Sequence, residues 1–188
     1  MFNILNMLEK YILIKAIQKI ISEPGRSFSV RELASSTSIS VGASKMALDY
    51  MKEMGIVTLK TIGKTYQYRA DLENPLCRQW KILFNLDLIQ KHGIAENLAR
   101  KIDNIHAIIL YGSFARGTND ERSDIDLLVL AHKPKKIDLG FVNKTGKEAN
   151  ITIMGMKDWK SKAKKDRVFY ENVIYDSIVL YGERPVIL

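Results

Sequence analysis

The chain contains one cysteine and three histidines among its 188 residues. A single cysteine, Cys77, excludes an internal disulfide framework and is typical of a reducing compartment. A lone cysteine is most often a small buried apolar side chain. The histidines, at positions 92, 106 and 132, are scattered and form no Cys/His cluster of the kind that binds zinc. These scarcities exclude small folds that depend on disulfide or zinc crosslinks.

Long hydrophobic runs are also missing. Apolar runs such as 11–14 and 107–111 are far shorter than the roughly 18 residues that a membrane-spanning helix needs. The N-terminus lacks the basic start, apolar centre and small-residue cleavage site that define a signal peptide. With 46% hydrophobic and 27% charged residues, the composition is that of a globular protein. We therefore expect a cytoplasmic protein without a membrane partner.

Basic residues exceed acidic ones, giving a net charge of +8. Residues 1–70 hold ten Lys and Arg against five Asp and Glu, whereas residues 71–188 hold 19 against 16. The excess is thus concentrated in the smaller part of the chain. This distribution indicates a polyanionic partner for that part, although solubility alone would also explain it.

The N-terminal region shows a succession of helix and hairpin signals. Apolar residues at helical spacing predict a helix up to Glu23, which Pro24-Gly25 ends. Ser29 and Ser40 are suitable caps for helices through Ala34 and to Met54, separated by a turn at 35–38. Runs rich in strand-forming residues at 56–62 and 65–69, joined by Gly63-Lys64, predict a hairpin.

This order of elements over residues 1–70 resembles a winged helix-turn-helix domain. The resemblance implies that the third helix enters the DNA major groove and that the hairpin touches the backbone. Ser44 and Lys45 would then face the groove, and Lys60 and Lys64 would lie on the wing. The third helix has no Arg, Asn or Gln to read base edges. Two interpretations stay open: binding of duplex DNA, or formation of a homodimer or a complex with a protein partner.

A mostly polar segment, 71–75, reads as a linker that closes with proline. Helices are then predicted over 76–92 and 94–102, followed by a strand that begins at Ile105. We expect an α+β chain with two domains, 1–70 and 75–188.

Two carboxylates at the start of an apolar strand are the most informative feature of the chain. Residues 108–111 form an apolar strand that ends at Gly112-Ser113, and a second strand begins at Asp124 and Asp126. Side chains at i and i+2 of a strand share a face, with Cα atoms roughly 6.5 Å apart. Unscreened, such a pair repels by about 2–3 kcal/mol at an effective dielectric near 20. A divalent cation shared with a phosphate chain would offset that cost. The alternative is that Gly112-Ser113 is only a turn in which Ser113 is a helix N-cap, and that both aspartates lie at a solvated edge.

The run GSFARG at 112–117, followed by SDID at 123–126, resembles the signature of minimal nucleotidyltransferases of the DNA polymerase β-like superfamily. The resemblance covers residues 95–188 and implies a mixed β-sheet flanked by helices. By the resemblance, Gly112 and Ser113 hold the phosphates of a nucleoside triphosphate and Arg116 contacts phosphate or substrate. Asp124 and Asp126 would ligate Mg²⁺ or Mn²⁺.

The sequence departs from this pattern on the strand after the second aspartate. The superfamily places a third carboxylate there, but this chain has Asn150 and Thr152 near that position. Glu148 lies on the same strand face because the three positions are spaced by two. Either Glu148 is the catalytic substitute, or the third carboxylate is lost and only nucleotide and metal binding remain.

The resemblance implies metal-dependent transfer of a nucleoside monophosphate from a nucleoside triphosphate to a hydroxyl of a macromolecular acceptor, either protein or RNA. It also implies a biological setting, since some minimal nucleotidyltransferases are antitoxins that modify or bind a toxin. The alternative is a DNA-binding transcriptional regulator whose nucleotidyltransferase domain senses a nucleotide or a partner without catalysis.

Overall fold

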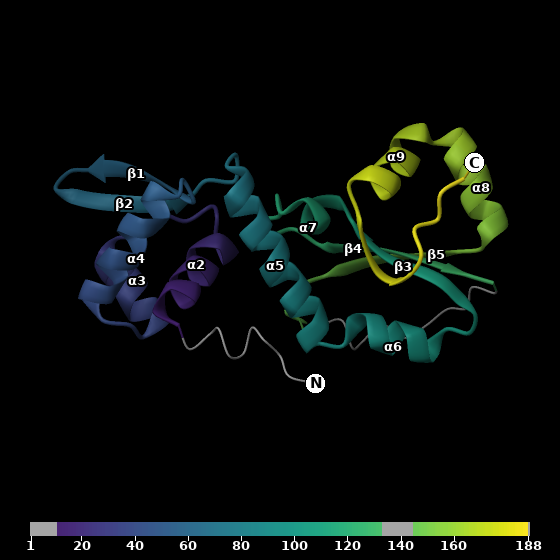
Figure 1. Cartoon of the computed structure of the whole chain (residues 1–188), viewed down its shortest axis with the longest axis horizontal. Helices are drawn as coiled ribbons and strands as arrows, with labels where there is room; N and C mark the ends of the chain where they lie inside the picture. Colours follow the sequence, from purple (N-terminus) through teal and green to yellow (C-terminus); the bar gives the residue numbers. More distant parts are fainter. Residues whose placement is uncertain (1–10, 133–144, 188) are drawn as a thin grey trace. The chain divides into compact units, whose positions relative to one another are not determined.

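The computed structural model describes residues 11–132 and 145–187 (Figure 1). The chain divides into two compact units, Met1–Phe84 and Asn85–Leu188. The division falls within helix α5 (Pro75–Lys91), so residues 71–75, which were expected to be a linker, lie in the first unit. No helix in the described ranges is long and apolar enough to cross a membrane.

The first unit contains α2 (Ile12–Ser22), α3 (Val30–Thr37), α4 (Val41–Glu53), and a hairpin of β1 (Val57–Ile62) and β2 (Thr65–Ala70). The buried residues of its core come from all of these elements and include Ile17, Ile20, Leu33, Leu48, Met51, Val57 and Tyr68. Cys77 from the start of α5 is also buried in this core, as expected for a lone cysteine. Burial raises the pKa of its thiol to about 11.

Serine caps start two of these helices, as the sequence predicts. Ser29 Oγ accepts from Glu32 N at 3.3 Å, and Glu32 Oε2 accepts from Ser29 N at 2.7 Å, forming a capping box. Ser40 Oγ accepts from Ala43 N at 3.1 Å. The expected end of α3 at Ala34 is wrong, because the helix continues through the predicted turn to Thr37. The Thr37 hydroxyl donates to the Leu33 carbonyl at 2.6 Å, which satisfies this polar side chain within the helix.

The second unit is a mixed α+β structure. Its described strands form a four-stranded sheet in the order β5-β4-β3-β6. These are β3 (Ile105–Tyr111), β4 (Ile125–Ala131), β5 (Ala149–Met154) and β6 (Ile178–Gly182). Strand β3 is antiparallel to both β4 and β6, whereas β4 and β5 are parallel. The mixed sheet flanked by helices that the sequence predicts is therefore confirmed.

Helices cover both faces of this sheet (Figure 1). On one face, Ile125, Leu127 and Val129 of β4 pack in a cluster with residues of α5 and of α6 (Ile94–Lys101). On the other, Leu128 and Leu130 pack with Trp159 of α8 (Met156–Lys165) and Val173 of α9 (Arg167–Tyr175). The alternation along β4 therefore assigns each of its buried side chains to one of the two helical layers.

Candidate functional site

Asp124 immediately precedes β4 and Asp126 is its second residue, on the sheet face that α8 and α9 cover further along. Asp126 is opposite Tyr111 of β3 and opposite Asn150 of β5 in the strand register. Asp126 is two residues from Leu128 and so shares its face of the sheet, and Leu128 packs in the cluster with Trp159. The aspartates are partly exposed, whereas the apolar residues that follow on this face are buried. The apolar face of the sheet therefore ends in a polar edge.

An asparagine amide joins the two carboxylates. Asn150 Nδ2 donates to Asp124 Oδ2 at 3.3 Å and to Asp126 Oδ1 at 3.2 Å. Both carboxylates therefore point toward the same small region of space. The partial positive charge of the amide hydrogens reduces their mutual repulsion, because each carboxylate accepts a hydrogen bond from one donor group.

The turn after β3 approaches the Asp126 carboxylate closely. Gly112 has φ +72°, and a Cβ built at this position would lie 2.4 Å from Asp126 Oδ2. Only glycine combines this left-handed backbone with so short a separation. Gly112 starts the short helix α7 (Gly112–Arg116), which contains the partly exposed Ser113 and ends at the exposed Arg116. The glycine therefore brings this backbone turn beside the acidic pair.

A buried pair of asparagines forms a hydrogen bond with the backbone of α7, directly after the glycine turn. Asn85 Nδ2 donates to the Phe114 carbonyl at 2.9 Å and to Asn119 Oδ1 at 2.8 Å. Asn119 Nδ2 donates in return to Asn85 Oδ1 at 3.3 Å. Asn85 is 7% exposed and Asn119 is 4% exposed, so water competes little for these hydrogen bonds. They connect α5, α7 and the segment after Gly117 into one polar network.

The segment before Asp124 has its own polar contacts. Ser123 Oγ donates to Asp120 Oδ1 at 2.8 Å, and this hydrogen bond is the main reason that the pKa of Asp120 lies below its usual value. Lys147 Nζ donates to the carbonyls of Asp120 at 3.2 Å and Glu121 at 2.6 Å. The backbone that leads into the acidic pair is thus tied to the segment that leads into β5.

Tyr111 borders the acidic pair on the β3 side. Its ring packs edge-to-face on Phe169 of α9, with the centroids 5.5 Å apart. Burial raises the pKa of the Tyr111 hydroxyl, a hydrogen bond with Thr152 lowers it, and the Asp126 charge raises it further. The net shift is upward, so the hydroxyl stays protonated at neutral pH and can serve as a donor.

Glu148 is exposed and immediately precedes β5. Its carbonyl accepts from Ile125 N at 2.9 Å, which aligns the starts of β4 and β5. In the part of the chain that the structure describes, no three His, Cys, Asp or Glu side chains gather into a group that could hold a metal ion. The catalytic role of Glu148 stays a prediction.

The chemistry of the donor set suits a hard divalent cation. Mg²⁺ is usually held by one or two carboxylates together with substrate phosphates. Asp124 and Asp126 provide the carboxylates, and the missing Cβ of Gly112 lets the backbone turn lie directly against the Asp126 carboxylate. The residues present therefore fit a cation that shares its coordination with a phosphate chain.

The residues expected to contact DNA differ in their surroundings. Ser44 is fully buried, and its hydroxyl has no hydrogen-bond partner among the residues that the structure describes, so its placement does not suit the expected groove contact. Lys45 is exposed but forms an ion pair with Asp49, which raises the pKa of its ammonium group. Lys60 and Lys64 are exposed on the hairpin. The hairpin thus offers two exposed basic groups.

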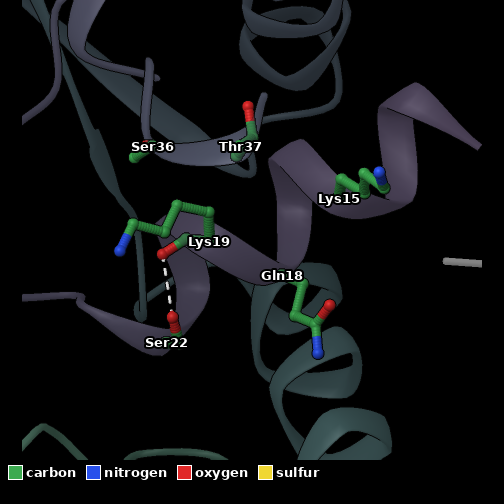
Figure 2. A pocket seen from close by; sticks show the side chains of 6 residues that line it. All are labelled: Lys15, Gln18, Lys19, Ser22, Ser36 and Thr37. Atoms are coloured by element: carbon green, nitrogen blue, oxygen red, sulfur yellow. Dashed lines mark hydrogen bonds between the residues drawn. The ribbon is translucent and has the colours of Figure 1, made fainter. Parts of the chain in front are cut away.

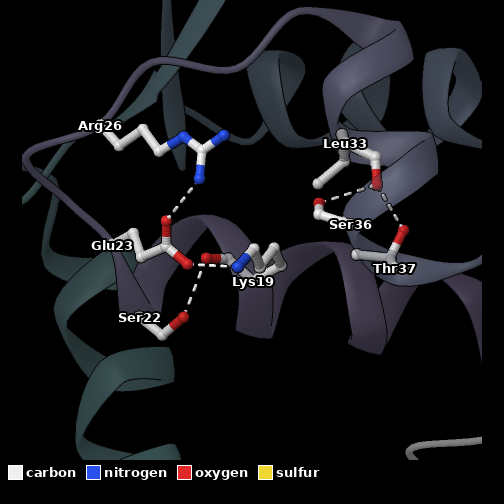
Figure 3. Close-up of polar contacts among 7 residues, drawn as sticks. All are labelled: Lys19, Ser22, Glu23, Arg26, Leu33, Ser36 and Thr37. Atoms are coloured by element: carbon white, nitrogen blue, oxygen red, sulfur yellow. Dashed lines mark hydrogen bonds and ion pairs between the residues drawn. The ribbon is translucent and has the colours of Figure 1, made fainter.

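The first unit also contains a pocket of about 310 Å³ between α2 and α3, lined by Lys15, Gln18, Lys19, Ser22, Ser36 and Thr37 (Figure 2). Lys19 and Arg26 form ion pairs with Glu23, and the pKa of Glu23 is lowered chiefly by its hydrogen bond with Lys19 (Figure 3). The Ser22, Ser36 and Thr37 hydroxyls donate to backbone carbonyls. Their protons are therefore already used within the helices.

A family model described as polymerase beta, nucleotidyltransferase matches residues 92–185, which is half of the chain. The chain therefore belongs to this nucleotidyltransferase family. The matched residues include the glycine turn, both aspartates and Asn150. No curated protein matches the sequence.

Solved structures show partial similarity. A toxin–antitoxin crystallised with AMP-PNP is 23% identical, with coverage of 48% of this chain and 72% of that chain and a TM-score of 0.34. A protein assigned as a nucleotidyltransferase from Sulfolobus solfataricus is 21% identical, with 56% and 87% coverage and a TM-score of 0.34. The archaeal chromatin protein TrmBL2 is 13% identical, with 88% and 72% coverage and a TM-score of 0.30.

Sequence reasoning missed several residues around the acidic pair. In the sequence, Asn150 marks only a position without a carboxylate, whereas the structure makes it the hydrogen-bond partner of both aspartates. Tyr111 and the Asn85–Asn119 pair were not singled out. A signal for Asn150 was present, because a parallel pairing of the two apolar strands from their first residues places position 150 beside Asp126.

Proposed function

We propose that this protein is a divalent-metal-dependent nucleotidyltransferase that moves a nucleoside monophosphate from a nucleoside triphosphate to a hydroxyl of a macromolecular acceptor. The observation that supports this most is the close approach of the Gly112 turn to a carboxylate pair whose members both face Asn150. Family membership supports the same reaction class.

In this proposal, Gly112 and Ser113 hold the phosphates of the triphosphate, and the exposed Arg116 contacts phosphate or substrate oxygens through its guanidinium group. Asp124 and Asp126 hold Mg²⁺ or Mn²⁺. When bound, the cation neutralises phosphate charge and orients the triphosphate. Glu148 is assigned as the general base that accepts the proton of the acceptor hydroxyl.

The acceptor is proposed to be a macromolecule, either a protein or an RNA. The described elements of the second unit form the sheet, the helices that cover it and the short α7. Among these described elements there is no separate module for binding an acceptor, which favours an acceptor that brings its own recognition surface. An antitoxin-like role, with a toxin protein as acceptor or partner, is the biological setting we propose.

Binding is tested by calorimetry with a non-hydrolysable triphosphate and Mg²⁺. The wild type should bind, and the double variant Asp124→Asn/Asp126→Asn should lose binding because the cation has no carboxylate ligands. Glu96→Gln, an exposed carboxylate on α6, serves as the control that leaves binding unchanged. Equal affinity of the wild type and the double variant would disprove the assignment of the metal ligands.

Catalysis is tested by transfer of label from an α-labelled triphosphate to RNA or to co-expressed protein. Glu148→Gln should lower transfer by about 10²–10⁴-fold while nucleotide binding persists, as removal of a general base does. If Glu148→Gln transfers like the wild type while Asp124→Asn is inactive, Glu148 is not the base. If the wild type binds nucleotide but transfers to no acceptor, the non-catalytic regulator is the better description.

The second candidate function is DNA-binding transcriptional regulation through residues 1–70 as a winged helix-turn-helix. The excess of five basic residues in that region and the exposed Lys60 and Lys64 favour it. With few base-reading side chains, binding should depend mainly on phosphate contacts and fall steeply with salt. Titration of labelled duplexes at several salt concentrations tests this, with Lys60→Ala/Lys64→Ala expected to reduce both affinity and salt dependence. Affinity that ignores salt would contradict it.

A feature of α4 favours the alternative that this region contacts protein. Met46 and Tyr50 of α4, and Met54, which directly follows its last residue, are spaced by four and are 75%, 46% and 40% exposed. This spacing aligns them along one side of the helix, where apolar groups suit a protein surface better than a phosphate backbone. Sedimentation of the full chain decides whether a homodimer forms. A dimer that Met46→Lys and Tyr50→Lys dissociate would favour this alternative over DNA binding.

A further inference from the structure

Asn150 contacts both carboxylates of the proposed cation site, yet its amide carries no charge. Its nitrogen donates to both aspartates, at 3.3 Å and 3.2 Å. Asn150 lies opposite Asp126 in the β4–β5 register, which fixes its backbone beside the pair. The group that faces the two carboxylates is thus a donor, whereas a metal ligand must be an acceptor.

We propose that Asn150 makes cation binding conditional on the nucleotide. In the metal-free protein, its amide nitrogen links the two carboxylates. When a cation arrives with a triphosphate, the amide rotates and presents Oδ1 to the cation as a third oxygen ligand. This proposal rests on the proposed function, because it assumes that the site binds a metal–triphosphate complex.

The rotation requires no movement of the backbone. The oxygen and nitrogen of an asparagine amide are nearly equal in size, and a half turn about the terminal torsion exchanges them. Asn150 is exposed, so water can take over the hydrogen bonds that its amide gives up as it turns. The same residue can therefore be a donor to the carboxylates without metal and a metal ligand with it.

The charge of the donor set explains why the nucleotide is needed. Two carboxylates and a neutral amide carry one negative charge fewer than three carboxylates, and the affinity of oxygen sites for hard cations depends on ligand charge. A bare cation must also displace the hydrogen bonds of Asn150. A triphosphate supplies the missing negative charge, so the cation and the nucleotide should bind cooperatively.

The experiment measures binding of Mn²⁺ to the full chain by calorimetry, alone and together with a non-hydrolysable triphosphate. The wild type should bind bare Mn²⁺ at least about 10-fold more weakly than Mn²⁺ with triphosphate. Asn150→Asp should bind bare Mn²⁺ about 10–100-fold more tightly than the wild type. The dependence on nucleotide should therefore shrink in this variant.

Two further measurements separate this role from a structural one. Without metal, Asn150→Asp should unfold at a lower temperature than the wild type, and Mn²⁺ alone should restore its stability, because three close carboxylates repel until a cation binds. Asn97→Asp, which places the same charge on α6, is the control and should leave Mn²⁺ binding unchanged.

The outcomes distinguish this proposal from the proposed function. If the wild type binds no triphosphate in the presence of Mn²⁺, the proposed function fails. If it binds triphosphate with Mn²⁺ but Asn150→Asp binds bare Mn²⁺ no better than the wild type, only the role of Asn150 is overturned. If the wild type binds Mn²⁺ equally tightly with and without triphosphate, the role of Asn150 is also overturned. This measurement uses the wild type alone and so does not depend on the folding of a variant.

Discussion

At the scale of single residues, Gly112 combines a left-handed backbone with a close approach to Asp126. We expect Gly112→Ala to destabilise the chain by about 1–3 kcal/mol, since alanine is strained at φ +72° and its Cβ would lie 2.4 Å from Asp126 Oδ2. Displacement of the carboxylate should also weaken binding of triphosphate with Mg²⁺ by at least about 10-fold. Thermal unfolding and calorimetry measure the two effects.

Gly146→Ala is the matched control for this prediction. Gly146 has nearly the same backbone conformation, φ +71°, but a Cβ there would meet no atom within 4 Å. It should therefore show the cost of backbone strain without the collision. Equal nucleotide affinity in both variants would show that the contact with Asp126 is unimportant for binding.

The Asn85–Asn119 pair gives a second prediction for individual side chains. Asn119→Ala removes one member and leaves the amide of Asn85 buried with fewer partners, which should cost about 1–3 kcal/mol of stability. Because the pair acts as a unit, Asn85→Ala/Asn119→Ala should cost less than the sum of the single variants. Denaturant unfolding measures all three, and strictly additive costs would contradict the coupling.

At the scale of elements, the capping box of α3 predicts a dependence on pH. Hydrogen bonds from the Ser29 side chain and backbone lower the pKa of Glu32 below its ordinary value of 4.5. A carboxyl whose pKa is lower when folded stabilises the fold at higher pH, and this contribution disappears as pH falls through the folded pKa. Glu32→Gln should therefore be less stable than the wild type at pH 7 but nearly equal to it near pH 3. Thermal unfolding at both values tests this.

Glu53→Gln is the control for the capping box. Glu53 is the last residue of α4, where a negative charge opposes the helix dipole rather than supporting it. Its replacement should leave stability unchanged or slightly increased at pH 7. A loss at pH 7 as large as that of Glu32→Gln would indicate a general charge effect rather than a specific cap.

Local chemistry allowed much of the element order to be predicted. Ser29 and Ser40 predict helix starts because their hydroxyls cap nearby backbone amides. Gly63-Lys64 predicts a hairpin because these residues favour a tight turn between two strands. The predicted end of α3 was wrong because Ser36 and Thr37 hydroxyls bond to a helical carbonyl, although such residues usually favour turns.

Contacts between distant parts of the sequence were harder to predict. The acidic pair and the glycine turn could be read as a candidate site because each is a local pattern. The role of Asn150 depends on the β4–β5 register, which pairs residues 24 positions apart in the sequence and leaves no local pattern. Asn85 and Asn119 are 34 positions apart, and no periodic pattern relates them. Their pairing follows from how α5 packs in the second unit.

At the scale of the whole molecule, the two units have separate hydrophobic cores. Leu48 is fully buried in the cluster of the first unit, and Leu128 is fully buried in a cluster of the second. Separate cores allow separate cooperative transitions, because each unit can lose its packing while the other keeps its own. We therefore expect two transitions in calorimetric unfolding of the full chain.

Core variants and ligand should assign these transitions. Leu48→Ala should lower only the transition temperature of the first unit, and Leu128→Ala only that of the second. A buried Leu→Ala change costs about 2–5 kcal/mol of unfolding free energy. A triphosphate with Mg²⁺ should raise only the transition temperature that Leu128→Ala lowers. At a ligand concentration about 100 times the dissociation constant, the gain in unfolding free energy should be about 2.7 kcal/mol. A single transition that both variants and the ligand shift would show instead that the units unfold together. A ligand shift confined to the transition of the first unit would place the nucleotide outside the sheet that carries Asp124 and Asp126.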